Sequence, residues 1–298
     1  MHRPTTVVAA IAASVVVGLL AGVLAPSHVH SAGPQTTRGG EERLVVAALG
    51  DSFTSGEGVE PYLDATRCHR SRAAWPARLT LNGVTARARN FACSGARTTA
   101  LTTSFKGRLP QLRALRQAVT RADVDVVTLT MGGNDVEFAR TLTACVLEVA
   151  CERGGGPLDR AHRRITVLGD QIGADYRAVR AAAGGAPVVV VGYPRLFPAG
   201  NDDEDCLWLT DAERDGLNSL ARRLNATLRD AADLRGLSYI PQLATLAGHE
   251  LCTDRPWLFP VDGISGQRQA HPTGRGLAAI AAVVTERLPR VLTPLTPP

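Results

Sequence analysis

Lysine is almost missing from this sequence. Lys106 is the single lysine, so arginine supplies nearly all of the 33 basic residues behind the net charge of +5. The arginines are scattered along the chain, and no basic run with interleaved aromatic residues occurs. Proteins that bind nucleic acid gather their positive charge into a patch or a stripe. The charge pattern therefore argues against a nucleic-acid partner.

Motifs of several large protein classes are missing as well. The sequence has no Cys-x-x-Cys pair and no His-Glu-x-x-His, the spacings typical of zinc sites. It has neither Gly-x-Gly-x-x-Gly nor a glycine-rich loop ending in Lys-Ser or Lys-Thr, which bind nucleotides. Gly-x-Ser-x-Gly, the nucleophile motif of the α/β-hydrolases, does not occur either. We therefore expect neither a zinc site nor a nucleotide cofactor.

The residues that are present suit a folded, exported protein. The chain has 298 residues, 45% hydrophobic and 20% charged, a balance typical of a globular protein with a buried core. Its N-terminus starts with basic residues, runs apolar over 7–25 and ends in small residues near Ala32. This pattern predicts a signal peptide over 1–32 and a secreted protein, with an uncleaved membrane anchor as the alternative. A flexible lead-in over 33–43 and one domain over 44–298 would follow.

Short apolar runs alternate with longer segments of helical periodicity. The runs predict strands at 44–49, 124–131 and 188–191, and 84–91 and 238–240 are further strand candidates. The periodic segments predict helices at 72–81, 108–121, 158–183, 211–232 and 274–288. This alternation predicts an α/β fold, a central parallel sheet of about five strands with helices on both faces. Three further segments are predicted to be loop excursions from the same domain, namely 141–157, 194–209 and 241–270.

Four candidate site residues lie just after predicted strands or just before the last predicted helix. They are Ser52, Gly95, Asn134 and His271. Ligands bind at the carboxyl edge of a parallel sheet, where these residues would meet. A histidine can take the proton of a serine hydroxyl that attacks an ester, while glycine and asparagine N–H groups can stabilise the oxyanion. Each segment alone is also typical of a turn or a helix cap, but the four together predict ester hydrolysis.

The segments around these residues resemble the motifs of one superfamily. Residues 50–58 read Gly-Asp-Ser-Phe-Thr-Ser-Gly-Glu-Gly, 90–96 read Asn-Phe-Ala-Cys-Ser-Gly-Ala, 132–135 read Gly-Gly-Asn-Asp, and 271–276 read His-Pro-Thr-x-x-Gly. In this order they resemble the SGNH, or GDSL, hydrolases, above all the secreted lipases and esterases of Streptomyces. The resemblance covers about residues 44–288.

The resemblance implies a flavodoxin-like αβα sandwich that needs no metal and no organic cofactor. It implies that Ser52 is the nucleophile and His271 the base. It also implies an oxyanion hole formed by the backbone N–H of Ser52, Gly95 and Asn134.

One position departs from the pattern of the superfamily. Many members carry aspartate three residues before the histidine, where this chain has Arg268. Some secreted actinomycete relatives hold the histidine with a backbone carbonyl instead, and by that likeness we expect the backbone carbonyl of Arg268 to orient His271. The alternative is that Asp254 or Asp262 reaches the histidine from the preceding loop.

The six cysteines predict disulfides, because an even count in an exported chain is typical of them. Spacing alone leaves many pairings open. The resemblance implies sequential pairing, which joins Cys68 to Cys93, Cys145 to Cys151 and Cys206 to Cys252.

Two of the predicted loops are rich in large apolar residues. They contain Leu196, Phe197, Leu207, Trp208, Trp257, Leu258 and Phe259. These side chains can line an acyl groove or form the core of their own loops. Together with the resemblance, they favour a lipase or esterase that acts on uncharged acyl esters or lipids of medium or longer chain. We expect the enzyme to be a monomer that touches lipid surfaces transiently. The alternatives are a carbohydrate deacetylase of the same superfamily and a non-catalytic surface-binding relative.

Overall fold

The computed structural model describes residues 43–121, 124–147, 151, 153–199, 208–262 and 266–292, all of which belong to one compact unit. The predicted signal peptide and all but the last residue of the predicted lead-in lie outside these residues. Among the residues that the structure describes, no helix combines the length and the apolar composition that a membrane crossing needs.

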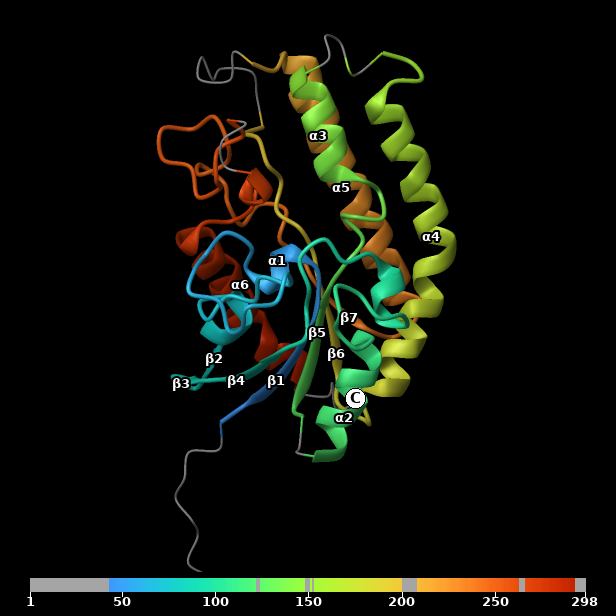
Figure 1. The fold of residues 1–298 in the computed structure, drawn as a ribbon, viewed down its shortest axis with the longest axis vertical. Helices are drawn as coiled ribbons and strands as arrows, with labels where there is room; N and C mark the ends of the chain where they lie inside the picture. The colour runs from blue at the N-terminus through green and yellow to red at the C-terminus, as the bar shows by residue number, and fades with distance from the viewer. Residues whose placement is uncertain are drawn as a thin grey trace, which may run out of the picture. The chain divides into compact units, whose positions relative to one another are not determined.

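A five-stranded parallel sheet forms the centre of the domain (Figure 1). Its order is β4-β1-β5-β6-β7, with β4 at Arg87–Asn90, β1 at Val45–Gly50, β5 at Val126–Thr130, β6 at Val188–Val191 and β7 at Ser238–Ile240. Each neighbouring pair runs parallel. All residues of β5 and β6 are buried, as expected for continuous apolar runs covered on both faces. The predicted sheet is confirmed.

Helices cover both faces of this sheet. One face packs against α2 (Gln111–Arg121), α4 (Pro157–Ala182) and α5 (Asp211–Asp233), and the other against α6 (Gly274–Leu292). Alternation along the strands separates the two cores, since Val188 and Val190 face the first layer and Val189 and Val191 the second. Figure 1 shows α4 and α5 side by side on one face and α6 on the other. The predicted αβα sandwich is therefore confirmed.

The prediction of a helix over 72–81 is wrong. The segment forms a single 3-10 turn, η1 (Trp75–Arg78), followed by a small antiparallel hairpin of β2 (Thr80–Leu81) and β3 (Val84–Thr85). Between these strands Asn82 and Gly83 have φ values of 51° and 83°. Asn-Gly with both φ values positive is the preferred two-residue hairpin turn, so the sequence carried a signal that competes with the helical periodicity.

A second difference concerns the predicted loop over 141–157. Most of the described residues at its start belong to α3 (Phe138–Leu147), which buries Leu142 and Cys145 on one side. Phe138, Leu142 and Cys145 have helical spacing, so an amphipathic stripe was present. This helix matters for function because it borders the candidate site.

Candidate active site

The site begins where β1 ends. Gly50 has a φ of 148°, and a Cβ there would lie 2.5 Å from the carbonyl oxygen of Thr130, so only glycine fits this turn. The next residue, Asp51, caps the short helix α1 (Ser52–Ser55) by accepting a hydrogen bond from the N–H of Phe53 at 3.0 Å. This local structure presents Ser52 at the carboxyl edge of the sheet.

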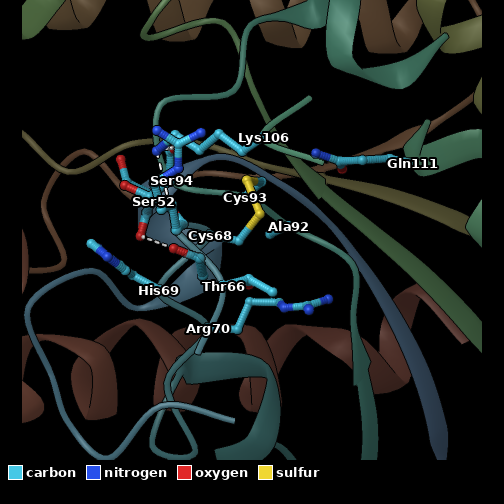
Figure 2. Close-up of a disulfide and its surroundings, with 12 residues drawn as sticks. Ser52, Thr66, Cys68, His69, Arg70, Ala92, Cys93, Ser94, Lys106 and Gln111 are labelled. Atoms are coloured by element: carbon cyan, nitrogen blue, oxygen red, sulfur yellow. Dashed lines mark hydrogen bonds between the residues drawn. A yellow bond between two sulfur atoms is a disulfide. The ribbon is translucent and has the colours of Figure 1, made fainter. Parts of the chain in front are cut away.

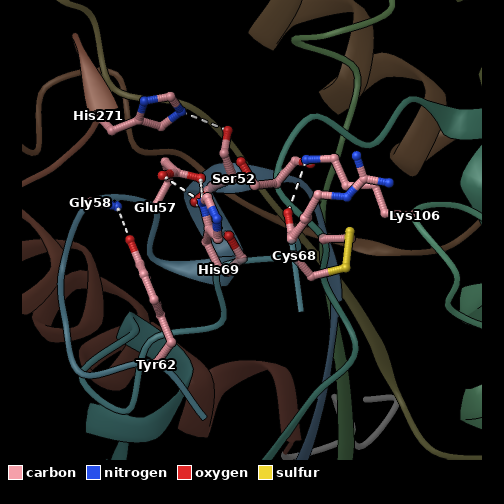
Figure 3. Close-up of polar contacts among 12 residues, drawn as sticks. Ser52, Glu57, Gly58, Tyr62, Cys68, His69, Lys106 and His271 are labelled. Carbon is pink, nitrogen blue, oxygen red and sulfur yellow. Dashed lines mark hydrogen bonds and ion pairs between the residues drawn. A yellow bond between two sulfur atoms is a disulfide. The ribbon is translucent and has the colours of Figure 1, made fainter. Parts of the chain in front are cut away.

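Ser52 and His271 are in direct contact. The Oγ of Ser52 lies 2.7 Å from Nε2 of His271, although 219 positions separate the two residues. Figure 3 shows this hydrogen bond. The ring of Phe53 packs against the imidazole with centroids 5.3 Å apart. Burial lowers the pKa of His271, which favours the neutral ring that can accept a proton.

The second ring nitrogen of His271 is held by a backbone carbonyl, but a different one from that expected. Nδ1 donates to the carbonyl oxygen of Gln269 at 3.1 Å, whereas the carbonyl of Arg268 accepts the backbone N–H of His271 at 3.0 Å. Nδ1 is thus hydrogen-bonded to Gln269, while the carbonyl of Arg268, the residue expected, also acts on the ring and raises its pKa. The cause is backbone geometry: η4 (Gly266–Arg268) ends at Arg268, and Ala270 then takes a φ of 57°. The carbonyls of Gln267, Arg268 and Gln269 all raise the pKa of His271.

The side chain of Arg268, at the position where many members of the superfamily carry aspartate, packs on an aromatic ring. Arg268 is exposed, and its guanidinium lies over the ring of Phe259 at 5.2 Å. Asp254 and Asp262, the alternative partners, are also exposed, and the Nδ1 hydrogen of His271 is occupied by Gln269. The geometry therefore favours a serine–histidine pair oriented by the main chain.

All four predicted site residues border one cavity. Ser52, Gly95, Asn134 and His271 line a volume of about 310 Å³. Asn134 is fixed by a hydrogen bond from Nδ2 to the carbonyl of Ala96 at 3.0 Å, which ties it to the loop of Gly95. An amide nitrogen has two hydrogens, so the second can be directed at a substrate oxygen.

The disulfide between Cys68 and Cys93 braces the loop of Gly95 (Figure 2). The N–H of Ser94 donates to the carbonyl of Cys68 at 3.0 Å, and Lys106 Nζ donates to the carbonyl of Ser94 at 2.7 Å. The same ammonium group also donates to the carbonyl of Arg67 at 3.0 Å. The disulfide and the first two hydrogen bonds thus hold the segment that precedes Gly95, and the third fixes Lys106 to the loop of Cys68.

Two of the three predicted disulfides are confirmed, Cys68–Cys93 and Cys145–Cys151. Cys252 is disulfide-bonded, and Cys206, its predicted partner, lies outside the described residues. Within the described part of the chain, no group of His, Cys, Asp and Glu side chains could hold a metal ion.

Comparison with known proteins identifies the family. The model of the GDSL-like lipase/acylhydrolase family matches residues 48–279, from the strand before Ser52 to the helix after His271. The chain belongs to this family.

Relatives in this family are similar along most of the chain. Lipase 1 of Streptomyces coelicolor is 31% identical over 265 residues, which cover 87% of this chain and 93% of the relative. The crystal structure of an extracellular lipase from Streptomyces rimosus has a TM-score of 0.67 and 30% identity, covering 83% of this chain and 99% of that one. Phospholipase A1 from Streptomyces albidoflavus has a TM-score of 0.64 and 30% identity, covering 82% of this chain and 99% of that one.

The apolar wall of the cavity differs from the one predicted. Of the seven predicted lining residues, Leu196 lines the cavity. Phe197, Trp208, Trp257 and Leu258 contribute instead to an apolar cluster under the loops, Phe259 stacks under Arg268, and Leu207 lies outside the described residues. The wall comes instead from α3, through Phe138 and Leu142, and from Leu224 of α5.

Sequence reasoning missed a residue that supports the floor of the site. Tyr193 follows β6, where its hydroxyl donates to Asp51 Oδ2 at 2.6 Å and accepts the N–H of Gly133 at 3.1 Å. Burial raises the pKa of Asp51 to about 7 despite this hydrogen bond. The signal was the position of Tyr193 directly after a strand, at the same edge as the other site residues.

Proposed function

We propose that this protein is a secreted carboxylester hydrolase in which Ser52 is the nucleophile and His271 the general base. The observation that carries the proposal is the 2.7 Å contact between Ser52 Oγ and His271 Nε2 inside an apolar-walled cavity. A serine hydroxyl becomes an effective nucleophile when a neighbouring base takes its proton.

The reaction proceeds in two halves. Ser52 Oγ attacks the ester carbonyl while its proton passes to Nε2, and Nδ1–H of the resulting imidazolium stays bonded to Gln269. The tetrahedral oxyanion is stabilised by the N–H groups of Ser52 and Gly95 and by Nδ2 of Asn134. When this intermediate collapses, the imidazolium protonates the leaving alcohol and an acyl-enzyme forms. Water then attacks the acyl-enzyme with His271 again as base, which releases the fatty acid and restores Ser52.

The shape and lining of the cavity favour an acyl chain as the bound group. Phe138, Leu142, Leu196 and Leu224 offer an apolar surface that suits a hydrocarbon better than a sugar. The printed names of the similar proteins, lipase and phospholipase A1, support lipid esters as the substrate class. This disfavours the carbohydrate deacetylase, and the complete serine, glycine, asparagine and histidine set disfavours a non-catalytic surface-binding relative.

The disulfides, the N-terminal sequence and a similar extracellular enzyme all support export. Two buried disulfides suit an oxidising compartment. The basic and apolar start of the chain is typical of a signal peptide, and the similar Streptomyces rimosus enzyme is described as extracellular. We propose that the enzyme acts there as a monomer with transient contact to lipid surfaces.

The test is hydrolysis of a p-nitrophenyl ester series from acetate to palmitate by wild type, Ser52→Ala and His271→Ala. We expect each variant to lose on the order of a thousandfold or more in kcat. Asp254→Ala and Asp262→Ala serve as matched controls and should retain most of the activity. Full activity of folded Ser52→Ala would contradict the mechanism. Activity confined to acetyl groups on a polysaccharide would contradict the substrate class.

A further inference from the structure

One buried carboxylate beside the nucleophile has no part in the mechanism above. Glu57 follows α1 and is 4% exposed, and its backbone N–H donates to the carbonyl of Ser52 at 3.1 Å. Taking a carboxylate out of water is costly unless a partner compensates. A buried carboxylate within a few residues of the nucleophile therefore calls for a physical explanation.

The compensating partner is a second histidine. Nδ1 of His69 lies 2.9 and 2.8 Å from the two carboxylate oxygens of Glu57. His69 is held in turn by stacking on Tyr62, with ring centroids 5.0 Å apart, and by its neighbour Cys68 in the disulfide. The hydroxyl of Tyr62 accepts the N–H of Gly58 at 3.1 Å. Glu57 is thus fixed in place rather than free to rotate into solvent.

The loop of Glu57 packs directly against the loop of the catalytic histidine. A Cβ at Gly58 would lie 2.6 Å from the Cβ of Arg268, three residues before His271. Figure 3 shows the Glu57 carboxylate between His69 on one side and His271 on the other. Both ring nitrogens of His271 are already hydrogen-bonded, one to Ser52 and the other to Gln269. An effect of Glu57 on the ring is therefore electrostatic and does not require a hydrogen bond.

We propose that Glu57 is a positioning residue of the hydrolase, one that supplies at a distance the negative charge which an aspartate at position 268 would supply by contact. When Ser52 loses its proton, His271 becomes a half-buried cation, and the neutral carbonyl of Gln269 compensates only part of that charge. A fixed carboxylate nearby stabilises the cation electrostatically. His69 holds the carboxylate in its orientation through the contacts of Nδ1 with both carboxylate oxygens. This inference rests on the proposed function.

Among the described residues, the charged and titratable groups around Glu57 are His69, His271, Lys106 and Tyr62. Glu60 and Arg268 lie next to this group and act on Tyr62 with opposite sign. Burial lowers the pKa of His271, and the charge of Glu57 raises it. Because His271 must be neutral to act as base, its protonation sets the acid limb of kcat/KM. Loss of the Glu57 charge therefore moves that limb to lower pH.

The experiment is the pH profile of p-nitrophenyl butyrate hydrolysis for Glu57→Gln, which keeps the shape and removes the charge. We expect the acid limb to move to lower pH by about one unit and the plateau kcat to fall by about tenfold. Both changes correspond to the same loss of stability of the imidazolium, because one pKa unit equals a factor of ten. Glu57→Asp restores a charge and should move the limb back toward wild type. A merely structural role would lower activity without moving the limb.

Glu250→Gln is the matched control, because Glu250 is also buried and paired, with Arg195 at 2.7 Å, but its charge is not among those that act on His271. It should cost stability and leave the acid limb in place. If Glu57→Gln does not fold, the double variant Glu57→Gln/His69→Asn removes both members of the pair together, which is less destabilising than leaving one buried charge, and should shift the limb in the same direction. An unchanged limb in the folded variant overturns the inference. If Ser52→Ala stays active, the proposed function itself fails, so the two failures are distinguishable.

Discussion

The two described disulfides close loops of very different length, and their removal should therefore cost different amounts of stability. Cys68 and Cys93 are 25 positions apart, and Cys145 and Cys151 are 6 apart. All four side chains are between 1% and 3% exposed, so replacing either pair with alanine deletes two buried sulfur atoms and leaves similar cavities. The difference in the free energy of unfolding between the two variants then measures the effect of loop length.

Loop entropy gives the expected magnitude. Cross-linking removes conformations from the unfolded chain in proportion to the logarithm of loop length, which yields about 3.5 kcal/mol for the longer loop and about 2.2 kcal/mol for the shorter one. The Cys68→Ala/Cys93→Ala variant should therefore be less stable than Cys145→Ala/Cys151→Ala by about 1.3 kcal/mol. Urea unfolding followed by tryptophan fluorescence measures both free energies.

Activity should separate the two variants further. The carbonyl of Cys68 accepts the N–H of Ser94, and Cys93 lies two residues before Gly95. Without the covalent tie the N–H of Gly95 is aimed less accurately at the oxyanion, so we expect kcat to fall by about tenfold with little change in KM. The Cys145→Ala/Cys151→Ala variant should keep kcat within about twofold of wild type. Equal kcat in both folded variants, or a larger stability loss from the shorter loop, would refute this reasoning.

Two further changes test the surroundings of the site. Lys106→Met removes the ammonium group that holds the carbonyls of Ser94 and Arg67, and should lower kcat several-fold while KM stays near wild type, whereas an effect confined to KM would point to substrate binding instead. Asp51 has a pKa raised by burial from 3.8 to about 7, so between about pH 4 and about pH 7 the folded protein keeps a proton that the unfolded chain has lost. The free energy of unfolding should fall across this window by up to about 4 kcal/mol and level off above it. Asp51→Asn should lack that component, and a pH-independent stability difference between variant and wild type would contradict the assignment.

The sheet could be predicted because its strands are defined by local composition. Apolar runs that are buried on both faces, as in β5 and β6, leave a clear pattern. All five predicted strands are present in the described residues, although β4 at the edge of the sheet is partly exposed and the segment 84–91 also contributes β3 to the hairpin. The helix over 72–81 failed because a two-residue turn at Asn82–Gly83 competes with the periodicity of the segment before it. Helical periodicity alone does not reveal such competition.

The residues that meet at the site were predictable, and their supporting contacts were not. Motif order identified Ser52, Gly95, Asn134 and His271, which the fold brings to one cavity. The carbonyl that holds His271 depends on the φ of Ala270, a torsion that spacing cannot specify. The apolar wall was misassigned because a large side chain in a loop can face the cavity or the loop's own core, and long-range packing decides between them.

The scarcity of lysine has a practical consequence for anyone who labels or immobilises this protein. Amine-reactive dyes and aldehyde supports have one side-chain target in the whole sequence, Lys106, apart from the amino group at the chain's start. That target lies at the wall of the reaction chamber, next to Gly95, and burial lowers its pKa, which increases the fraction in the reactive neutral form. Attachment there would add bulk at the wall of the cavity and would disturb the hydrogen bond that holds Ser94. Conjugation through carboxylates avoids modifying the cavity wall. A lysine added elsewhere on the surface, combined with Lys106→Arg, achieves the same result for amine-reactive reagents.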